Sequence, residues 1–348
     1  MGFGKPSEPH CRLPQKRQPK NLHCPVNAES GGILGLSVLF FRVWLSKGHI
    51  LGDLMASTKK ILKLGLPKGS LQEATIELFR RAGIRISSSD RSYFPYCDDE
   101  EIEVMLIRSQ EMAKYVQDGL FDAGITGQDW ILETGARVKN ICELVYGKSG
   151  FKPVRWVLAV PQSSKIRSIE DLEGKTVATE LVNYVKKYFA RKKIKAKIEY
   201  SWGATEAKAG ILVDAIVELT ETGTSLKANQ LRIVEEILSS TTRFIANRKA
   251  WQDPWKRKKM ENIAILLKGA LAAHGMVGLK MNLKESDLPK VMTLLPSLKR
   301  PTVSPLTLPG WIALEVVVEE NVVKQIIPDL KRAGAQGIIE YPLNKLIV

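Results

Sequence analysis

The sequence predicts an α/β protein made of two α/β units and a smaller α+β unit at the carboxyl end. From Met55 onward, short apolar runs of strand length alternate with amphipathic stretches of helical spacing, and the rhythm starts again at "RWVLAVP". From about Val277 the order is strand, helix, strand, strand, helix, strand, the split βαβ pattern of ferredoxin-like domains. Two α/β units that face each other across a hinge form a ligand cleft.

The first unit is expected over residues 55–150. "KILKLGLP" predicts a buried strand, and "KGSLQEATIELFRRAG" a helix that begins near Ser70 and Glu73 as a capping box and stops at Gly83. "IEVMLIRS" predicts a strand, "QEMAKYVQDGL" a helix, and "FDAGITGQDWI" a strand with a glycine-rich turn before a helix. A return strand and a long helix at about 241–272 complete the unit. The alternation is typical of a parallel sheet.

The second unit is expected over residues 151–240 and the third over residues 273–348. The second contains the strand "RWVLAVP", the segment "SIEDLEGKTVAT", the basic helix "LVNYVKKYFARKK", the strand "AKIEY", a helix around Glu206 and the strand "DAIVEL". The third contains "VGLKMNL", "DLPKVMTLL", "TVSPL", "WIALEVVV", "NVVKQIIPDLKRAG" and "QGIIEYPL". A small appended module of this shape more often regulates or assembles than catalyses.

The composition favours a globular protein with anionic partners. The chain has 348 residues, 44% of them hydrophobic, and this is enough for two or three domains with cores. Its net charge of +15 favours nucleotides, phosphates or nucleic acid. Cys11, Cys24, Cys97 and Cys142 show no C-x-x-C spacing, so neither a zinc knuckle nor a disulfide framework is expected, and a reducing compartment is indicated.

The first 54 residues differ from the rest. Their apolar run "GGILGLSVLFFRVWL" is interrupted by Arg42 and is short for a membrane span. We expect the biological start at Met55; a leader or anchor and a disordered tail are the alternatives. Without this segment's seven basic and three acidic residues the charge is still +11, and only His274 of the four histidines remains. A histidine-dependent hydrolase or multi-histidine metal centre is therefore not expected.

A candidate binding turn lies in "VDAIVELTETGTSLKANQL", from Val213 to Leu231. A strand here is expected to deliver Asp214 and Glu218 toward its carboxyl end, where open α/β sheets bind ligands. "TETGTS" then presents backbone N–H groups and hydroxyls at a helix start, which suits a phosphate, whereas the neighbouring carboxylates suit sugar hydroxyls or a divalent cation. The stretch predicts a ribose 5-phosphate pocket; an ordinary capping turn with a solvated acidic rim is the alternative.

Several stretches together resemble one enzyme family. "DAIVELTETGTSLKANQL" resembles the phosphoribosyl pyrophosphate motif of ATP phosphoribosyltransferase, the first enzyme of histidine biosynthesis. "LKLGLPKGSL", "LFDAGITGQDWILETGA" and "GATEAKAG" resemble other parts of that family, and "RPTVSPL" with "GWIAL" its long form. The resemblance covers Met55 to Val348. Two departures stand out: Glu218 replaces a common aspartate, and the spacing from Glu206 to Asp214 is one residue short.

The resemblance implies two hinged periplasmic-binding-protein-like α/β domains, both catalytic, and a carboxy-terminal ferredoxin-like (ACT-like) regulatory domain. It implies that N1 of the adenine of ATP attacks the anomeric carbon of phosphoribosyl pyrophosphate and that pyrophosphate, chelated by Mg²⁺, leaves. Such a transfer has an oxocarbenium-like transition state and needs positioning and charge stabilisation rather than a protein nucleophile.

The resemblance also implies the site residues. Glu218 is expected on the ribose hydroxyls, and Asp214 either supports the turn or is a satisfied structural carboxylate. The residues expected around the 5-phosphate are Glu221, Thr222, Gly223, Thr224, Ser225 and Leu226. The residues expected on the ATP and polyphosphate side are Lys68, Gly69, Arg108, Gly127 and Asp129, with Gly124 and Thr126 lining the same cleft. A helix cap is the alternative role for Asp129.

The resemblance of the last domain also implies how the protein is regulated and assembled. The resemblance implies L-histidine as an inhibitor, a homo-hexamer in equilibrium with dimers, no need for a separate regulatory subunit, and a cytoplasmic location. The residues expected to face the effector are Thr302, Val303, Ser304, Pro305 and Leu306, with the neighbouring residues 308–312. Nucleic acid and membrane are not expected as partners, because Trp251 and Trp255 of "WQDPWKRKK" should pack an interhelical corner. A solute-binding protein and a basic nucleic-acid-binding protein are the rival classes.

Overall fold

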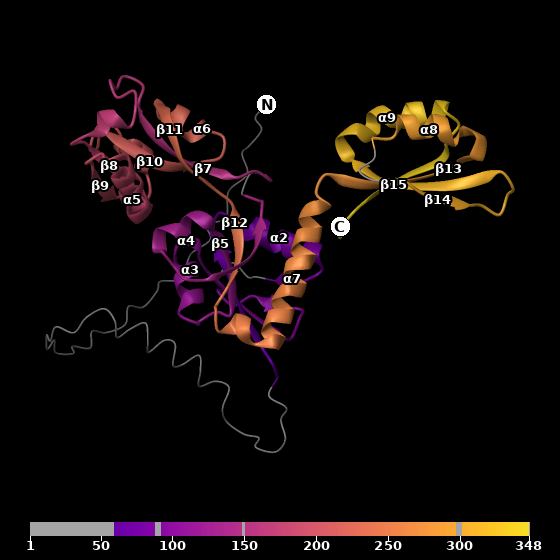
Figure 1. Ribbon diagram of the computed structural model, residues 1–348, viewed down its shortest axis with the longest axis horizontal. Coiled ribbons are helices and arrows are strands. Elements are labelled where there is room, and N and C mark those ends of the chain that lie inside the picture. The colour runs from indigo at the N-terminus through magenta and orange to yellow at the C-terminus, as the bar shows by residue number, and fades with distance from the viewer. Residues whose placement is uncertain (1–58, 88–91, 148–149, 297–300, 348) are drawn as a thin grey trace, which may run out of the picture. The chain divides into compact units, whose positions relative to one another are not determined.

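The computed structural model describes residues 59–87, 92–147, 150–296 and 301–347 (Figure 1). The expectations for residues 1–54 lie outside this part of the chain. The described residues form two α/β domains, here domain I and domain II, and a carboxy-terminal α+β domain. The predicted fold class is therefore confirmed. None of the described helices is long and apolar enough to cross a membrane.

Domain I is built on a five-stranded sheet in the order β4-β1-β5-β12-β6. Its strands are β1 (Leu62–Lys68), β4 (Ile102–Arg108), β5 (Ala123–Gly127), β6 (Lys139–Leu144) and β12 (Thr242–Ala246). Its helices are α2 (Gln72–Ala82), α3 (Ser109–Gln117), α4 (Gln128–Thr134) and α7 (Pro254–Ala272), with a short β2 (Ile86–Ser87) and β3 (Tyr96–Cys97) and the 3₁₀ turn η3 (Ala250–Gln252). Leu62, Leu64 and Leu66 are fully buried on one face of β1, and Gly65 and Pro67 are buried on the other, as expected for a strand covered on both faces.

Domain II is built on a second five-stranded sheet in the order β11-β7-β10-β8-β9. Its strands are β7 (Val154–Pro161), β8 (Thr176–Thr179), β9 (Lys197–Tyr200), β10 (Ala215–Thr220) and β11 (Leu231–Ser240). Its helices are α5 (Val182–Lys192) and α6 (Thr224–Ala228), with the 3₁₀ turns η1 (Glu170–Leu172) and η2 (Thr205–Lys208). The chain returns to domain I through Thr241, directly from β11 into β12.

The carboxy-terminal domain has the predicted ferredoxin-like order of elements. They are β13 (Met276–Lys284), η4 (Glu285–Asp287), α8 (Leu288–Leu294), β14 (Thr302–Pro305), β15 (Trp311–Glu319), α9 (Glu320–Arg332) and β16 (Gln336–Pro342). The four strands form an antiparallel sheet in the order β14-β15-β13-β16, and α8 and α9 lie on the same face of it (Figure 1). Alternate residues of β13, such as Val277, Leu279 and Met281, are buried beneath these helices.

Three local predictions are wrong. The sheets are mixed rather than parallel, because β12 runs antiparallel to β5, and β7 runs antiparallel to both β10 and β11. The helix expected around Glu206 is only the 3₁₀ turn η2. The N-cap of α2 is Leu71 and makes no side-chain hydrogen bond, so Ser70 and Glu73 do not form the expected capping box.

The two tryptophans near the start of α7 pack as predicted, but Lys256 and Lys259 are half-buried in ion pairs rather than solvated. Trp251 and Trp255 are half-buried against the core of domain I, and the carboxylate of Asp253 caps α7 by accepting hydrogen bonds from the amides of Trp255 and Lys256, both at 2.9 Å. His274 stacks on Phe151 with ring centroids 3.5 Å apart, which agrees with a structural role.

Candidate functional site

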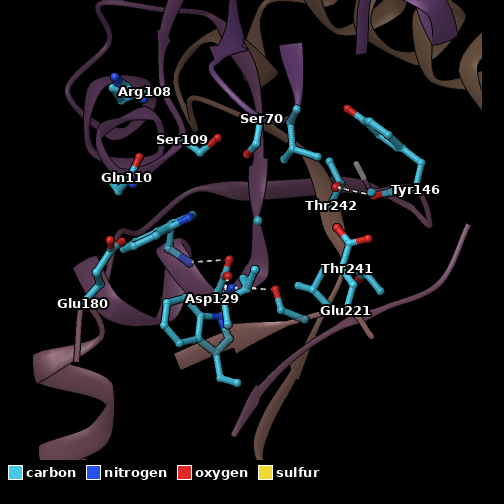
Figure 2. A pocket seen from close by; sticks show the side chains of 18 of the residues that line it. Ser70, Arg108, Ser109, Gln110, Asp129, Tyr146, Glu180, Glu221, Thr241 and Thr242 are labelled. Atoms are coloured by element: carbon cyan, nitrogen blue, oxygen red, sulfur yellow. Dashed lines mark hydrogen bonds between the residues drawn. The ribbon is translucent and has the colours of Figure 1, made fainter. Parts of the chain in front are cut away.

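A cavity of about 250 Å³ is lined by residues of both α/β domains (Figure 2). Lys68, Arg108 and Gly127 end the strands β1, β4 and β5 of domain I, so they reach the cavity from one edge of the sheet. Glu180 follows β8, and Glu218 lies two residues before the end of β10, so domain II also contributes the carboxyl ends of two parallel strands.

The cavity brings together about half of the predicted site residues. The predicted residues that line it are Lys68, Arg108, Gly127, Asp129, Glu218 and Glu221. Gly69 does not line it but lies beside it, because a Cβ atom there would be 3.1 Å from Nη1 of Arg108. Lys68 also faces the ring of Tyr93, with Nζ 5.4 Å from the ring centroid. Domain I therefore presents the cations Lys68 and Arg108 besides the buried Asp129, and domain II presents carboxylates.

The predicted phosphate turn lies next to the cavity, but several of its polar groups form hydrogen bonds with other groups of domain II. Gly223 has φ +79° and donates its amide to Oγ1 of Thr220 at 2.8 Å. The hydroxyls of Thr222 and Thr224 are 2.9 Å apart, and Ser225 donates its hydroxyl to Oε1 of Glu206 at 2.5 Å. The positive φ fits the glycine in "TETGTS", since other residues rarely adopt it.

Leu226 anchors the short helix that follows the turn. Its side chain is buried in domain II, so only its main-chain amide could take the predicted role at the 5-phosphate. The residues Thr222 to Leu226 are not among those that line the cavity.

Glu218 is the most perturbed carboxyl group at the cavity. Its pKa is raised to about 7, chiefly by burial and also by the nearby carboxylates of Glu206 and Glu180, whereas hydrogen bonds from the amide of Leu219 and the hydroxyl of Thr205 oppose the shift. The ionised form of such a buried carboxyl group is stabilised by hydrogen-bond donors that a ligand brings, such as sugar hydroxyls.

Asp129 is fixed by bonds that join the two domains. Its side chain is only 2% exposed, and it accepts hydrogen bonds from Nε1 of Trp156 at 2.7 Å and from the amide of Trp130 at 2.9 Å (Figure 2). Its own amide donates to Oγ of Ser240 at 3.0 Å. Burial raises its pKa. Both carboxylate oxygens are thus engaged, which suits a positioning role better than direct phosphate binding.

Gly127, two residues before Asp129, is required by packing. Gly127 and not Asp129 occupies the N-cap position of α4, although the Asp129 carboxylate accepts the amide of Trp130 in the first turn. A Cβ atom at Gly127 would lie 2.0 Å from Oδ1 of Asp129, so any side chain would displace the carboxylate.

Trp156→Phe should lower the free energy of unfolding by about 2 kcal/mol at pH 8, because Oδ2 of Asp129 would lose its donor inside the protein. The loss should shrink as the pH falls and Asp129 takes up a proton, since the removed bond stabilised the charged form. Urea denaturation at pH 8 and pH 5 measures both values. Trp255→Phe is the control, and an equal, pH-independent loss in the two variants would contradict the assignment.

Three predicted residues lie elsewhere. Gly124 packs under α3, where a Cβ atom would be 2.7 Å from Sδ of Met112, and Thr126 is buried with its hydroxyl on the carbonyl of Ser109 at 2.8 Å. Asp214 precedes β10 and accepts the amide of Thr176 at 2.9 Å, so it lies at the amino end of the strand. This bond fits the alternative given in the sequence analysis, that Asp214 is a satisfied structural carboxylate.

Other residues of the cavity were not predicted. Glu180 lies at the cavity (Figure 2), and burial raises its pKa, whereas the side-chain amide of Gln110 opposes the shift. Thr242 donates its hydroxyl to the carbonyl of Tyr146 at 3.0 Å, and the hydroxyl of Tyr146 is 2.7 Å from that of Thr75. The strand-end rule could have found Glu180, since it follows "TVAT" directly.

Comparisons with known proteins agree with the resemblance along most of the chain. Residues 108–269 match the family ATP phosphoribosyltransferase, and residues 273–345 match the family described as the HisG C-terminal domain. An ATP phosphoribosyltransferase of Chlorobium chlorochromatii is 58% identical over 293 residues, which are 84% of this chain and 100% of the relative. One of Thermodesulfovibrio yellowstonii is 58% identical over 288 residues, 83% of this chain and 99% of the relative.

A solved structure supports the same assignment. The ATP phosphoribosyl transferase (HisG:HisZ) complex from Thermotoga maritima contains a chain with a TM-score of 0.51 and 26% identity, and the match covers 60% of this chain and 99% of that one. From these matches and the fold, the chain belongs to the ATP phosphoribosyltransferases of histidine biosynthesis, a family of pentosyltransferases.

Proposed function

We propose that this protein transfers the phosphoribosyl group of 5-phosphoribosyl 1-pyrophosphate to N1 of the adenine of ATP. The N1 lone pair forms the new bond to C1 of the ribose, and the bond from C1 to the pyrophosphate oxygen breaks. The observation that carries this proposal is the cavity itself, which combines the strand-end cations Lys68 and Arg108 of domain I with the strand-end carboxylate Glu218 of domain II. One ligand with phosphates and a sugar needs both walls.

The ribose 5-phosphate is proposed to lie at the turn after β10. The first-turn amides of α6, including those of Ser225 and Leu226, have no acceptor within the helix, and the hydroxyls of Thr222 and Thr224 lie beside them. Glu218 would then accept hydrogen bonds from the ribose hydroxyls. Its raised pKa supports this role, because burial leaves the ionised group in need of donors.

The polyphosphates are proposed to face domain I. Arg108 offers a planar fork of donors and Lys68 a compact charge, and both stabilise the negative charge that grows on the leaving pyrophosphate. Mg²⁺ is proposed to arrive with the substrate, since pyrophosphate oxygens are the hard ligands that it prefers. Asp129 takes the role of holding the floor of the cavity rather than of binding phosphate.

Regulation is proposed to lie in the carboxy-terminal domain. The exposed strand β14, which contains Thr302 to Pro305, and the following Leu306 are the proposed effector-facing residues for L-histidine. We also propose a cytoplasmic homo-hexamer in equilibrium with dimers. Because the match to the HisG C-terminal domain lies in the same chain, no separate regulatory subunit would be needed.

The test is an absorbance assay of phosphoribosyl-ATP formation with ATP, phosphoribosyl pyrophosphate and Mg²⁺. Product formation that requires all three supports the transfer, and suppression by millimolar L-histidine supports regulation by the last domain. A folded protein that binds phosphoribosyl pyrophosphate but forms no product would contradict the proposed reaction. Full activity at saturating histidine would contradict the regulation alone.

A further inference from the structure

Helix α5 of domain II begins without a cap from its own segment. Its N-cap position is Leu181, no side chain of the segment makes a capping hydrogen bond, and its first turn contains no acidic residue. The first amides of a helix have no acceptor within it, and a local Ser, Thr, Asp or Asn normally supplies one. The sequence "ELVNY" supplies none at that position.

The missing acceptor comes from domain I. Oε1 of Glu133 accepts the amide of Asn183 at 2.9 Å, and Oε2 accepts the amide of Tyr184 at 2.8 Å. The side-chain amide of Asn183 also donates to the carbonyl of Glu133 at 3.3 Å. Glu133 lies near the end of α4, so a carboxylate of one domain caps a helix of the other. Its negative charge also matches the helix dipole.

This cap is continuous with the wall of the cavity. Glu180, which lines the cavity, stands two residues before α5. Asp129, four residues before Glu133 and one turn earlier in α4, bonds to Trp156 of domain II. Asp129 and Glu133 therefore both join domain I to domain II, and Glu133, unlike Asp129, lies outside the cavity lining.

We propose that Glu133 is a positioning residue for the transfer reaction: by capping α5 across the two domains, it holds Glu180 at the cavity and keeps the domains in the arrangement in which both substrates are bound. The proposal rests on the proposed function. If the domains separate, α5 loses its cap, so substrate binding between the domains and capping of α5 reinforce each other.

The experiment compares Glu133→Ala and Glu133→Gln with the wild type in the full chain. Hydrogen exchange should be about tenfold faster in Glu133→Ala for amides at the start of α5, and unchanged elsewhere in domain II. The kcat should fall about tenfold. Glu133→Gln, which keeps one acceptor oxygen, should be intermediate in both readouts and serves if the alanine variant does not fold.

Glu173→Ala is the matched control. Oε2 of Glu173 accepts the amide of Lys195 at 2.8 Å, so this carboxylate also holds a backbone amide, but within domain II. Its variant should keep the wild-type kcat. If Glu133→Ala exchanges faster at α5 but keeps the wild-type kcat, Glu133 is a structural cap only, and the proposal is overturned. Unchanged exchange at α5 in Glu133→Ala would also overturn it. A wild type without transfer activity would refute the proposed function. If ATP and phosphoribosyl pyrophosphate slowed hydrogen exchange at α5 in the wild type but not in Glu133→Ala, that result would still support the coupling.

Discussion

Replacement of Arg108 by alanine should lower kcat/KM for the transfer about 100-fold to 1,000-fold without unfolding the protein. Arg108 ends β4 and is the N-cap of α3, and its exposed side chain lines the cavity beside Gly69. Negative charge grows on the pyrophosphate as it leaves, and removal of a donor aimed at such charge costs about this much in rate. Initial rates at saturating Mg²⁺ and thermal unfolding followed by circular dichroism measure the two effects.

Two further variants make this result specific. Arg108→Lys keeps the charge but loses the planar fork, so its activity should fall between those of the wild type and Arg108→Ala. Arg85→Ala removes an exposed arginine of domain I that does not line the cavity and should be as active as the wild type. If Arg108→Ala stays within about threefold of the wild type, the polyphosphates are not held at this wall.

The regular elements of the fold could be predicted because their patterns are strong. Buried strands such as β7 contain an uninterrupted apolar run, from Trp156 to Val160, and the carboxy-terminal domain alternates clearly between buried and exposed positions. The strand β11 was missed for a physical reason. Its pairing with β7 shifts register between Ile233 and Glu235 and again between Glu236 and Leu238, so the simple alternation that reveals a strand is broken.

The site could be predicted only where sequence position determines spatial position. Lys68, Arg108 and Gly127 were implied by the family resemblance, and their place at the cavity agrees with the rule that the carboxyl ends of parallel strands meet at one edge of a sheet. The contact between Asp129 and Trp156 depends on how two domains meet, and no local pattern contains that information.

Strand boundaries and side-chain alternation explain the errors. Asp214 was placed at the carboxyl end of a strand that begins one residue after it. Gly124 lies in β5 like Gly127, but its position faces α3 rather than the cavity, and the glycine-rich pattern alone does not separate these roles.

Replacement of Glu218 by glutamine should lower transfer activity about 100-fold and at the same time stabilise the unliganded protein at pH 8. Burial and two neighbouring carboxylates raise the pKa of Glu218 from 4.5 to about 7, so the folded wild type binds a proton that the unfolded chain has released. Its stability should therefore fall as the pH rises from about 4.5 through about 7. Glutamine carries no charge and avoids this loss, which we expect to be about 2 kcal/mol at pH 8.

The pH dependence separates this explanation from a simple packing effect. Wild type and Glu218→Gln should have similar free energies of unfolding at pH 4 and diverge above pH 7, because only the wild type must ionise a largely buried carboxyl group. Glu199→Gln on β9, where the side chain is 42% exposed, should follow the wild type throughout. A constant difference at all pH values would remove the ionised carboxylate as the cause. Wild-type activity in Glu218→Gln would show that the ribose hydroxyls do not need this carboxylate, since glutamine retains the shape of the side chain but not the charge that strengthens their hydrogen bonds.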